Sequence, residues 1–196
     1  FVVRTEGEGR KGLEKVATRL SSEYSVPYLA HAAMEPLNCA VDLKKDSCTI
    51  WTGTQFQTVD RNAAATAAGL KPEQVSIHTT YLGGGFGRRA NPGSDFVTEA
   101  VEVAKAAKTP VKVIWTREDD MRGAWYRPLW FSRLDGGLDE TGKPVAWAHT
   151  IVGQSIMMGT PFEQSVIETG FDGTSVEGAM ELPYAIPNLA ICLLYT

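Results

Sequence analysis

Short runs of apolar and β-branched residues, bounded by glycine, proline or charged residues, predict strands along most of the chain. We expect strands over residues 28–33, 38–43, 48–53, 75–82, 110–116, 128–138 and 144–152. Residues 139–143, Asp-Glu-Thr-Gly-Lys, have the composition of a tight turn and should join the last two strands as a hairpin.

Helical spacing of apolar residues predicts three helices. Residues 10–24 form a short amphipathic pattern, and residues 58–70 are rich in alanine and end at a glycine followed by a proline. Residues 95–108 show the clearest pattern, with Asp95 as a candidate N-cap. The apolar face of this helix is formed by Val97, Ala100, Val101 and Ala104.

The order of these elements predicts an α+β fold, with mixed sheets and packed helices. Two strand–helix–strand passages, over 48–82 and 75–116, precede the hairpin. We expect a lead-in segment with a short helix over 1–27, an α/β domain over 28–153 and the start of a truncated subdomain over 154–196. The missing initiator Met and the apolar run that closes the chain predict an internal piece of a longer polypeptide.

Composition narrows the possible partners. A hydrophobic content of 43% allows an ordinary core, while a net charge of −4 and a pI near 5.4 argue against nucleic acid as a partner. No apolar run approaches the roughly eighteen residues of a membrane span.

The three cysteines are expected to be free thiols. Cys39 and Cys48 lie on a predicted hairpin around residues 44–47. Pairing about that turn places Leu43 opposite Cys48 and Thr52 opposite Cys39, which separates the two sulfur atoms.

The glycine-rich run Gly83–Arg89, Gly-Gly-Gly-Phe-Gly-Arg-Arg, is the strongest candidate for a binding loop. Four glycines in five positions are costly to order, but they permit positive φ and let a ligand approach the backbone N–H groups. Phe86 adds one aromatic side chain, and Arg88 and Arg89 add positive charge where the loop ends. A flexible connector is the simpler alternative.

Standard phosphate loops do not match this run. Arg88 stands where the dinucleotide pattern requires its third glycine, and no Lys-Ser or Lys-Thr pair follows as a P-loop requires. A nucleotide-binding oxidoreductase domain and a non-catalytic scaffold or interaction module remain as alternatives.

Together with other stretches, the loop resembles the molybdopterin-binding large subunits of the molybdenum hydroxylase (xanthine dehydrogenase and aldehyde oxidase) family. The reading GGGFGRR is most similar to the isoquinoline 1-oxidoreductase beta subunits. The other stretches that carry the resemblance, in the same order as in the family, are residues 31–40, 51–55, 110–113 and 115–121. The resemblance extends from about Tyr28 to the end of the chain.

The resemblance implies a bacterial oxidoreductase, of the cytoplasm or periplasm, that hydroxylates N-heterocycles or oxidises aldehydes with water as the oxygen source. It implies a molybdopterin cofactor in the cytosine dinucleotide form and a partner subunit with [2Fe–2S] clusters. The family's catalytic glutamate lies in a late glycine-rich segment that has no counterpart here. We therefore expect no catalytic residue in this chain, and no stoichiometric cofactor or activity in the 196 residues alone.

The resemblance also implies which residues bind the cofactor. In the family, the N–H group at the position of Gly87 hydrogen-bonds an apical oxygen ligand of molybdenum, and the ring at the position of Phe86 borders the substrate. The side chain of Gln55 would reach a pterin edge or cap a helix. The expected cofactor-binding residues are Gly84, Gly85, Phe86, Gly87, Arg88 and Gln55.

Two positions depart from the family pattern. Leu29 stands where xanthine oxidase relatives carry a glutamine near molybdenum, and Ala90 stands where xanthine-type enzymes carry a glutamate that orients purines. Purine substrates are therefore not expected.

The remaining polar and aromatic groups have structural interpretations. His31 and Glu35 stand four residues apart, but the nearby prolines argue against a helix, so we expect hydrogen bonding rather than a metal site. The charged residues 117–122 are expected to form a solvated loop. The aromatic residues expected in packing or at a partner interface are Trp125, Tyr126 and Trp130.

Overall fold

The computed structural model describes residues 1–195 and divides into two compact units. The terminal unit combines Phe1–Leu29 with Pro128–Thr196, and the inserted unit is the continuous segment Ala30–Arg127. This division differs from the expected α/β domain over 28–153. The reason is that the predicted hairpin pairs with an N-terminal strand of the terminal unit and not with the α/β sheet.

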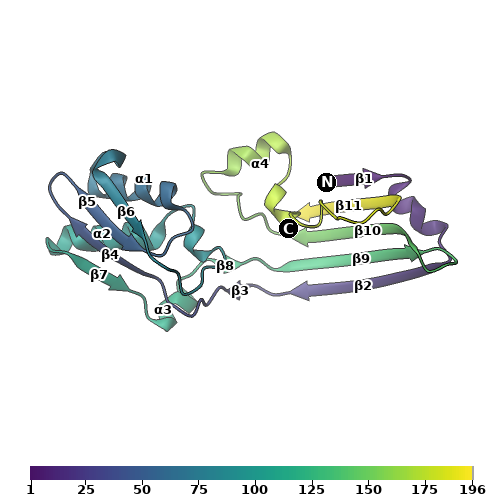
Figure 1. The fold of residues 1–196 in the computed structure, drawn as a ribbon, viewed down its shortest axis with the longest axis horizontal. Helices are drawn as coiled ribbons and strands as arrows, with labels where there is room; N and C mark the ends of the chain where they lie inside the picture. The colour runs from purple at the N-terminus through teal and green to yellow at the C-terminus, as the bar shows by residue number, and fades with distance from the viewer. Residues whose placement is uncertain (196) are drawn as a thin grey trace. The chain divides into compact units, whose positions relative to one another are not determined.

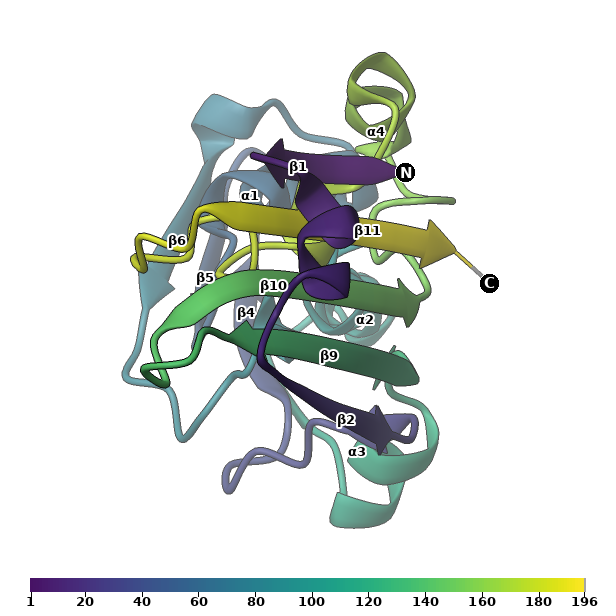
Figure 2. The ribbon, with the colours of Figure 1, turned by 90° about the vertical axis from the view of Figure 1, so that its right-hand side faces the viewer.

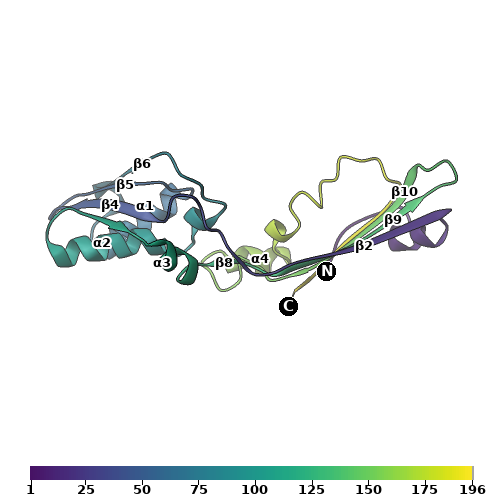
Figure 3. The ribbon, with the colours of Figure 1, turned by 90° about the horizontal axis from the view of Figure 1, so that it is seen from below.

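The inserted unit contains a four-stranded mixed sheet in the order β6-β5-β4-β7. Its strands are β4 (Asn38–Leu43), β5 (Cys48–Thr52), β6 (Val75–Thr79) and β7 (Val111–Ile114). Strands β5 and β6 are parallel, whereas β4 is antiparallel to both β5 and β7. Helices α1 (Gln57–Ala68) and α2 (Asp95–Ala107) cover one face of the sheet (Figure 3). The α+β fold class is confirmed.

Small and branched apolar side chains build the core between this sheet and its helices. Helix α2 buries Phe96, Val97 and Ala100, which pack with Val41 and Ile50 of the sheet. Helix α1 ends where the expected glycine adopts a left-handed conformation, Gly69 with φ 70°. The short 3₁₀ turn η2 (Pro72–Gln74) leads into β6. A second 3₁₀ turn, η3 (Arg88–Ala90), follows the glycines of the loop.

The terminal unit contains a five-stranded sheet in the order β1-β11-β10-β9-β2 (Figure 2). Its strands are β1 (Val2–Glu6), β2 (Thr18–Val26), β9 (Trp130–Leu138), β10 (Pro144–Gly153) and β11 (Asn188–Tyr195). Strands β10 and β11 are parallel and the other pairs are antiparallel. The predicted hairpin β9–β10 is confirmed.

Two small clusters cover this second sheet. The 3₁₀ turn η1 (Gly9–Glu14) packs Leu13 against Ala148 and Ala190. The segment with α4 (Glu163–Thr169) and η4 (Gly173–Ser175) leads to Val176, which packs against Ile151 and Leu193.

The expected helix over residues 10–24 is wrong. Residues 18–26 form strand β2, which pairs with β9 along its full length, and only η1 remains of the helical pattern. Threonine, tyrosine and valine favour a pleated surface, and nine consecutive pairings outweigh the helical spacing of a few apolar residues. Leu20, one of the apolar residues within the expected helix over 10–24, is 56% exposed.

Two further expectations need correction. The strand predicted over 28–33 is only β3 (Leu29–Ala30), which pairs with β8 (Tyr126–Arg127). The charged segment 117–122 is not a loop but helix α3 (Arg117–Arg122) (Figure 1). The hydroxyl of Thr116 and the carboxylate of Asp119 cap this helix reciprocally, and this capping pattern outweighs the high charge of the segment.

The predicted register of the β4–β5 hairpin is confirmed. Strands β4 and β5 pair Leu43 with Cys48 and Ala40 with Trp51, and all three cysteines are free. Burial raises the pKa of Cys39 to about 12 and that of Cys48 to about 11. Among residues 1–195, no helix has both the length and the hydropathy needed to cross a membrane.

Candidate functional site

The glycine loop between β6 and η3 adopts a strained conformation. Gly84, Phe86 and Gly87 have φ values of 104°, 57° and 98°. A positive φ is uncommon for an aromatic residue, and such strain tends to persist at binding sites. The Phe86 side chain is nevertheless 75% exposed, so packing within the chain does not explain its position.

Close approach of neighbouring side chains explains two of the glycines. A Cβ atom on Gly83 would lie 2.4 Å from the Cβ atom of Glu35. A Cβ atom on Gly85 would lie 2.4 Å from Oε1 of Gln55. A side chain at Gly83 would clash with the Cβ atom and backbone of Glu35, and a side chain at Gly85 would displace the Gln55 amide from its observed place.

Gln55 holds the loop from the side of helix α1. Its Oε1 atom accepts a hydrogen bond from the N–H of Gly87 at 3.1 Å, and its own N–H donates to the carbonyl of Arg89 at 3.0 Å. The N-cap of α1 is Phe56, so Gln55 does not cap the helix. Its amide nitrogen has no partner among residues 1–195 and remains a free donor. The N–H of Gly87, expected to face the cofactor, is already occupied in this structure.

Three consecutive backbone N–H groups of the loop are free donors. Those of Gly84, Gly85 and Phe86 make no hydrogen bond within the described part of the chain, residues 1–195. The positive φ values on either side of Gly85 curl the backbone, and consecutive amides in such a curl form a concave site for electronegative atoms.

Arg89 ties the loop to its surroundings and is fully buried. Its guanidinium donates to the carbonyls of Gly84 and Gly53, both at 3.0 Å, and to Oε2 of Glu35 at 2.9 Å. One side chain thereby joins the glycine loop, the turn before Gln55 and the turn at Glu35. Sequence reasoning placed Arg89 only as positive charge at the loop exit, because no acidic residue adjacent in sequence pointed to this role.

Glu35 completes the structural clamp. Its carboxylate accepts from the N–H of Gly83 at 3.0 Å, and its N–H donates to the carbonyl of Gly83 at 3.1 Å. Burial raises the pKa of Glu35, but hydrogen bonds from Gly83 and Asn38 and the charge of Arg89 outweigh it, and the net shift is downward. The carboxylate is therefore ionised and bound, as expected for a structural hydrogen-bonding group.

Arg88 points into the protein and not into the loop. Its side chain is 3% exposed, forms two hydrogen bonds to Asp95 at 3.0 and 2.8 Å, and lies over the Trp115 ring at 5.4 Å from the ring centroid. In this arrangement the Arg88 side chain anchors the start of α2. The expected role of Arg88 in cofactor binding stays a prediction.

A buried pair supports the turn that carries Gln55. The hydroxyl of Thr54 donates to the carboxylate of Asp60 and accepts the N–H of Phe56 at 2.9 Å. Burial raises the pKa of Asp60 more than its hydrogen bonds, including the one from Thr54, lower it, and the nearby Asp95 carboxylate adds to the upward shift. This pair fixes the first turn of α1 relative to the strand end.

The other residues singled out in the sequence lie outside this clamp. Trp125 is 56% exposed, the hydroxyl of Tyr126 donates to the carbonyl of Met121, and Trp130 packs on the cluster around Ile151. Within residues 1–195, no group of three or more His, Cys, Asp or Glu side chains is placed to hold a metal ion.

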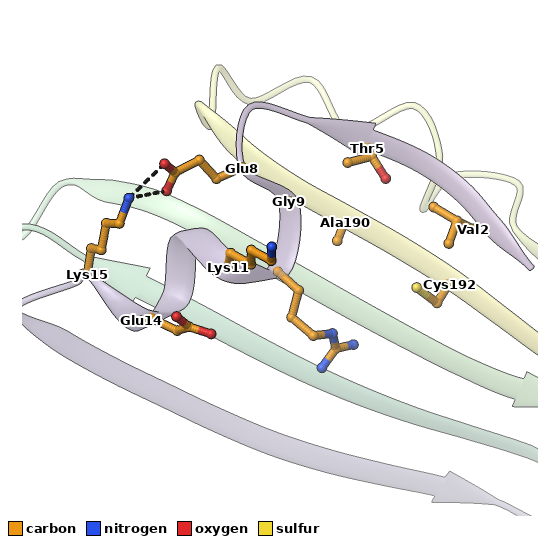
Figure 4. Close-up of a pocket in the computed structure, with 10 residues that line it drawn as sticks. Val2, Thr5, Glu8, Gly9, Lys11, Glu14, Lys15, Ala190 and Cys192 are labelled. Atoms are coloured by element: carbon orange, nitrogen blue, oxygen red, sulfur yellow. Dashed lines mark hydrogen bonds and ion pairs between the residues drawn. The ribbon is translucent and has the colours of Figure 1, made fainter.

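A separate hollow in the terminal unit has a volume of about 540 Å³ (Figure 4). It lies between η1, β1 and β11, and an ion pair between Lys15 and Glu8, at 2.7 Å, spans one side of it. Cys192, which lines it, is a free and partly exposed thiol.

Comparison with known proteins identifies the family. The family model described as the molybdopterin cofactor-binding domain matches residues 2–193. The isoquinoline 1-oxidoreductase subunit beta of Brevundimonas diminuta is 34% identical over 137 residues, which cover 69% of this chain and 17% of that protein. The aldehyde oxidoreductase molybdenum-binding subunit PaoC of Escherichia coli K12 is 32% identical, over 74% of this chain and 20% of the subunit. The chain thus spans about a fifth of the length of these relatives.

Solved structures share the fold. The aldehyde oxidoreductase of Desulfovibrio gigas superposes with a TM-score of 0.70 at 18% identity, covering 98% of this chain and 21% of that protein. Quinoline 2-oxidoreductase of Pseudomonas putida 86 gives a TM-score of 0.70 at 16% identity, covering 99% and 25%.

Proposed function

Because the chain belongs to the molybdopterin cofactor-binding domain family, we propose that it forms part of the cofactor-binding subunit of a molybdenum hydroxylase. The observation that carries this proposal is the set of free donors at the loop, the N–H groups of Gly84, Gly85 and Phe86 with the amide nitrogen of Gln55. A pterin is rich in oxygen and nitrogen acceptors, and these donors complement such an edge.

The substrate class of the complete enzyme is an N-heterocycle or an aldehyde, oxidised with water as the oxygen source. Relatives named isoquinoline 1-oxidoreductase and aldehyde oxidoreductase support this choice. Ala90, in place of a carboxylate that would orient a purine, is consistent with it. We further propose the cytosine dinucleotide form of the cofactor and a separate [2Fe–2S] subunit as the electron acceptor.

The residues of this chain bind and position; the redox chemistry is supplied by the cofactor when it is bound. The amides of Gly84, Gly85 and Phe86 donate hydrogen bonds, and the exposed ring of Phe86 provides an apolar wall for a planar substrate. Arg89 and Gln55 hold the loop in place, so that it need not reorganise when it binds.

The test is Gly85→Ala in the complete polypeptide. The added Cβ atom would meet Oε1 of Gln55, an exposed side chain that can swing away, so the substitution should disturb the donors and leave the fold intact. We expect pterin and molybdenum content to fall severalfold, with a melting temperature within about 2 °C of the unmutated protein.

Gly173→Ala is the matched control. Gly173 has no atom within 4 Å of its Cβ position and no positive φ, so content and stability should both stay unchanged. Full pterin and molybdenum content in Gly85→Ala would show that the loop is only a structural connector.

A further inference from the structure

His31 stands beside the glycine loop with one ring nitrogen unused. Its Nδ1 atom lies 3.1 Å from the carbonyl oxygen of Trp125. Its Nε2 atom has no hydrogen-bond partner among residues 1–195 and lies 3.9 Å from the position that a Cβ atom on Gly87 would occupy. The side chain is half-buried, so this nitrogen borders the loop at an accessible edge.

The hydrogen bond to Trp125 determines which nitrogen carries the proton. A carbonyl oxygen only accepts, so Nδ1 must be the N–H donor. Burial lowers the pKa of His31, and the charges of Arg88 and Arg127 lower it further, against the opposing effects of the Trp125 carbonyl and Asp120. The ring is therefore neutral near pH 7, and Nε2 presents a lone pair.

This lone pair adds a side-chain acceptor beside the free donors of the loop. Those donors are the N–H groups of Gly84, Gly85 and Phe86 and the amide nitrogen of Gln55, none of which has a partner among residues 1–195. Nε2 of His31 adds an acceptor beside them. A molecule with adjacent acceptor and donor groups could then be held by both kinds of contact.

The backbone around His31 is fixed in an uncommon conformation. Ala32 has a φ of 45°, which is unfavourable for alanine. The guanidinium of Arg117 donates to the carbonyl of Ala33 at 2.6 Å and to that of Met34 at 3.1 Å, which holds the following residues in place. Strain maintained by several contacts is typical of residues that bind a ligand.

We propose that His31 is a positioning residue whose Nε2 atom accepts a hydrogen bond from an N–H or O–H group of the molecule bound at the Gly84–Gly87 loop. The inference rests on the proposed function of that loop. The donor belongs either to the pterin or to the substrate, since both carry such groups.

Two substitutions in the complete polypeptide separate the two ring nitrogens. His31→Asn places an amide near Nδ1, which keeps the donor to Trp125 and removes the acceptor. His31→Gln reaches the position of Nε2 and gives up the contact with Trp125. We expect His31→Asn to lose about tenfold in ligand affinity and His31→Gln to recover part of it.

The readout identifies the source of the donor. If the donor is on the pterin, the pterin content of purified His31→Asn falls; if it is on the substrate, pterin content is unchanged and KM rises more than kcat falls. A purely structural role gives the opposite order, with His31→Asn normal and His31→Gln less stable, and overturns the inference.

If Gly85→Ala lowers pterin content while His31→Asn changes neither pterin content nor KM, this inference alone fails. If Gly85→Ala also has no effect, the proposed function fails with it.

Nitrogen-15 NMR of the 196-residue chain gives a readout that is independent of activity. We expect a neutral His31 ring at pH 7 with its proton on Nδ1. A proton on Nε2 would make this atom a donor and overturn the inference.

Discussion

Replacement of Arg89 by alanine should destabilise the inserted unit strongly. The substitution removes the donors that reach the carbonyls of Gly84 and Gly53 and the carboxylate of Glu35. These acceptors lie on three separate turns, so no neighbouring side chain can replace all of the lost contacts.

The magnitude follows from burial. Removing one partner of a buried ion pair costs about 3–5 kcal/mol, and each buried carbonyl left without a donor costs about 1–3 kcal/mol. The Glu35 side chain is 37% exposed, so water can solvate its carboxylate and reduce the first contribution. We therefore expect Arg89→Ala to lower the free energy of unfolding by about 4 kcal/mol. Arg89→Lys, which keeps the charge but loses the planar fork, should cost about 2 kcal/mol.

The assay must report on the inserted unit by itself, because a chain with two units need not unfold in one step. Native-state hydrogen exchange of the amides in β4 and β5 provides this measurement. Arg61→Lys, at an exposed position of α1, is the control and should change stability by less than about 0.5 kcal/mol. A loss of under about 1 kcal/mol in Arg89→Ala would refute the view that this side chain holds the loop together.

Three further outcomes are expected. Cys39 and Cys48 should resist a thiol reagent in the native protein, because burial raises their pKa values. Both should react after denaturation without reductant. A bridge between them found by mass spectrometry would contradict the strand register. Thr116→Ala should cost about 1 kcal/mol through loss of the cap of α3, measured as a shift in the urea midpoint, and an unchanged midpoint would contradict the cap. Burial lowers the pKa of His31 and His149 in the folded chain, so the unfolded chain binds protons first as the pH falls below about 6.5. The free energy of unfolding should therefore decrease as the pH falls through this range. Equal urea midpoints at about pH 7 and pH 5.5 would be inconsistent with this expectation.

Local patterns predicted the inserted unit well. Strands β4 and β5 and helix α2 lie where periodicity placed them, because each buries one regular face in a single core. Strand β2 was missed since its stability comes from pairing with β9, more than a hundred residues away, and spacing within residues 10–24 contains no trace of that partner.

The contact between the glycine run and Gln55 was predictable, but the other contacts of the run were not. The glycine run and Gln55 are together in space, as the resemblance implied. Arg88 and Arg89, adjacent in sequence, were both assigned as positive charge at the loop exit, yet each is buried and bound to a different partner. Their directions depend on Asp95 and Glu35, and tertiary contacts of this kind are not encoded in the loop itself.

The insertion of one continuous unit into a discontinuous one has a consequence for synthesis on the ribosome. Residues 30–127 contain every strand and helix of their own core and can fold as soon as they have emerged. Strands β1 and β2 are made earlier but pair only with β11 and β9, so they must wait as unpaired chain until the last third of the sequence has been translated. Loop closure over such a distance is slow, and β2, an edge strand whose nine residues are all exposed within residues 1–195, offers unpaired backbone to a chaperone during that interval.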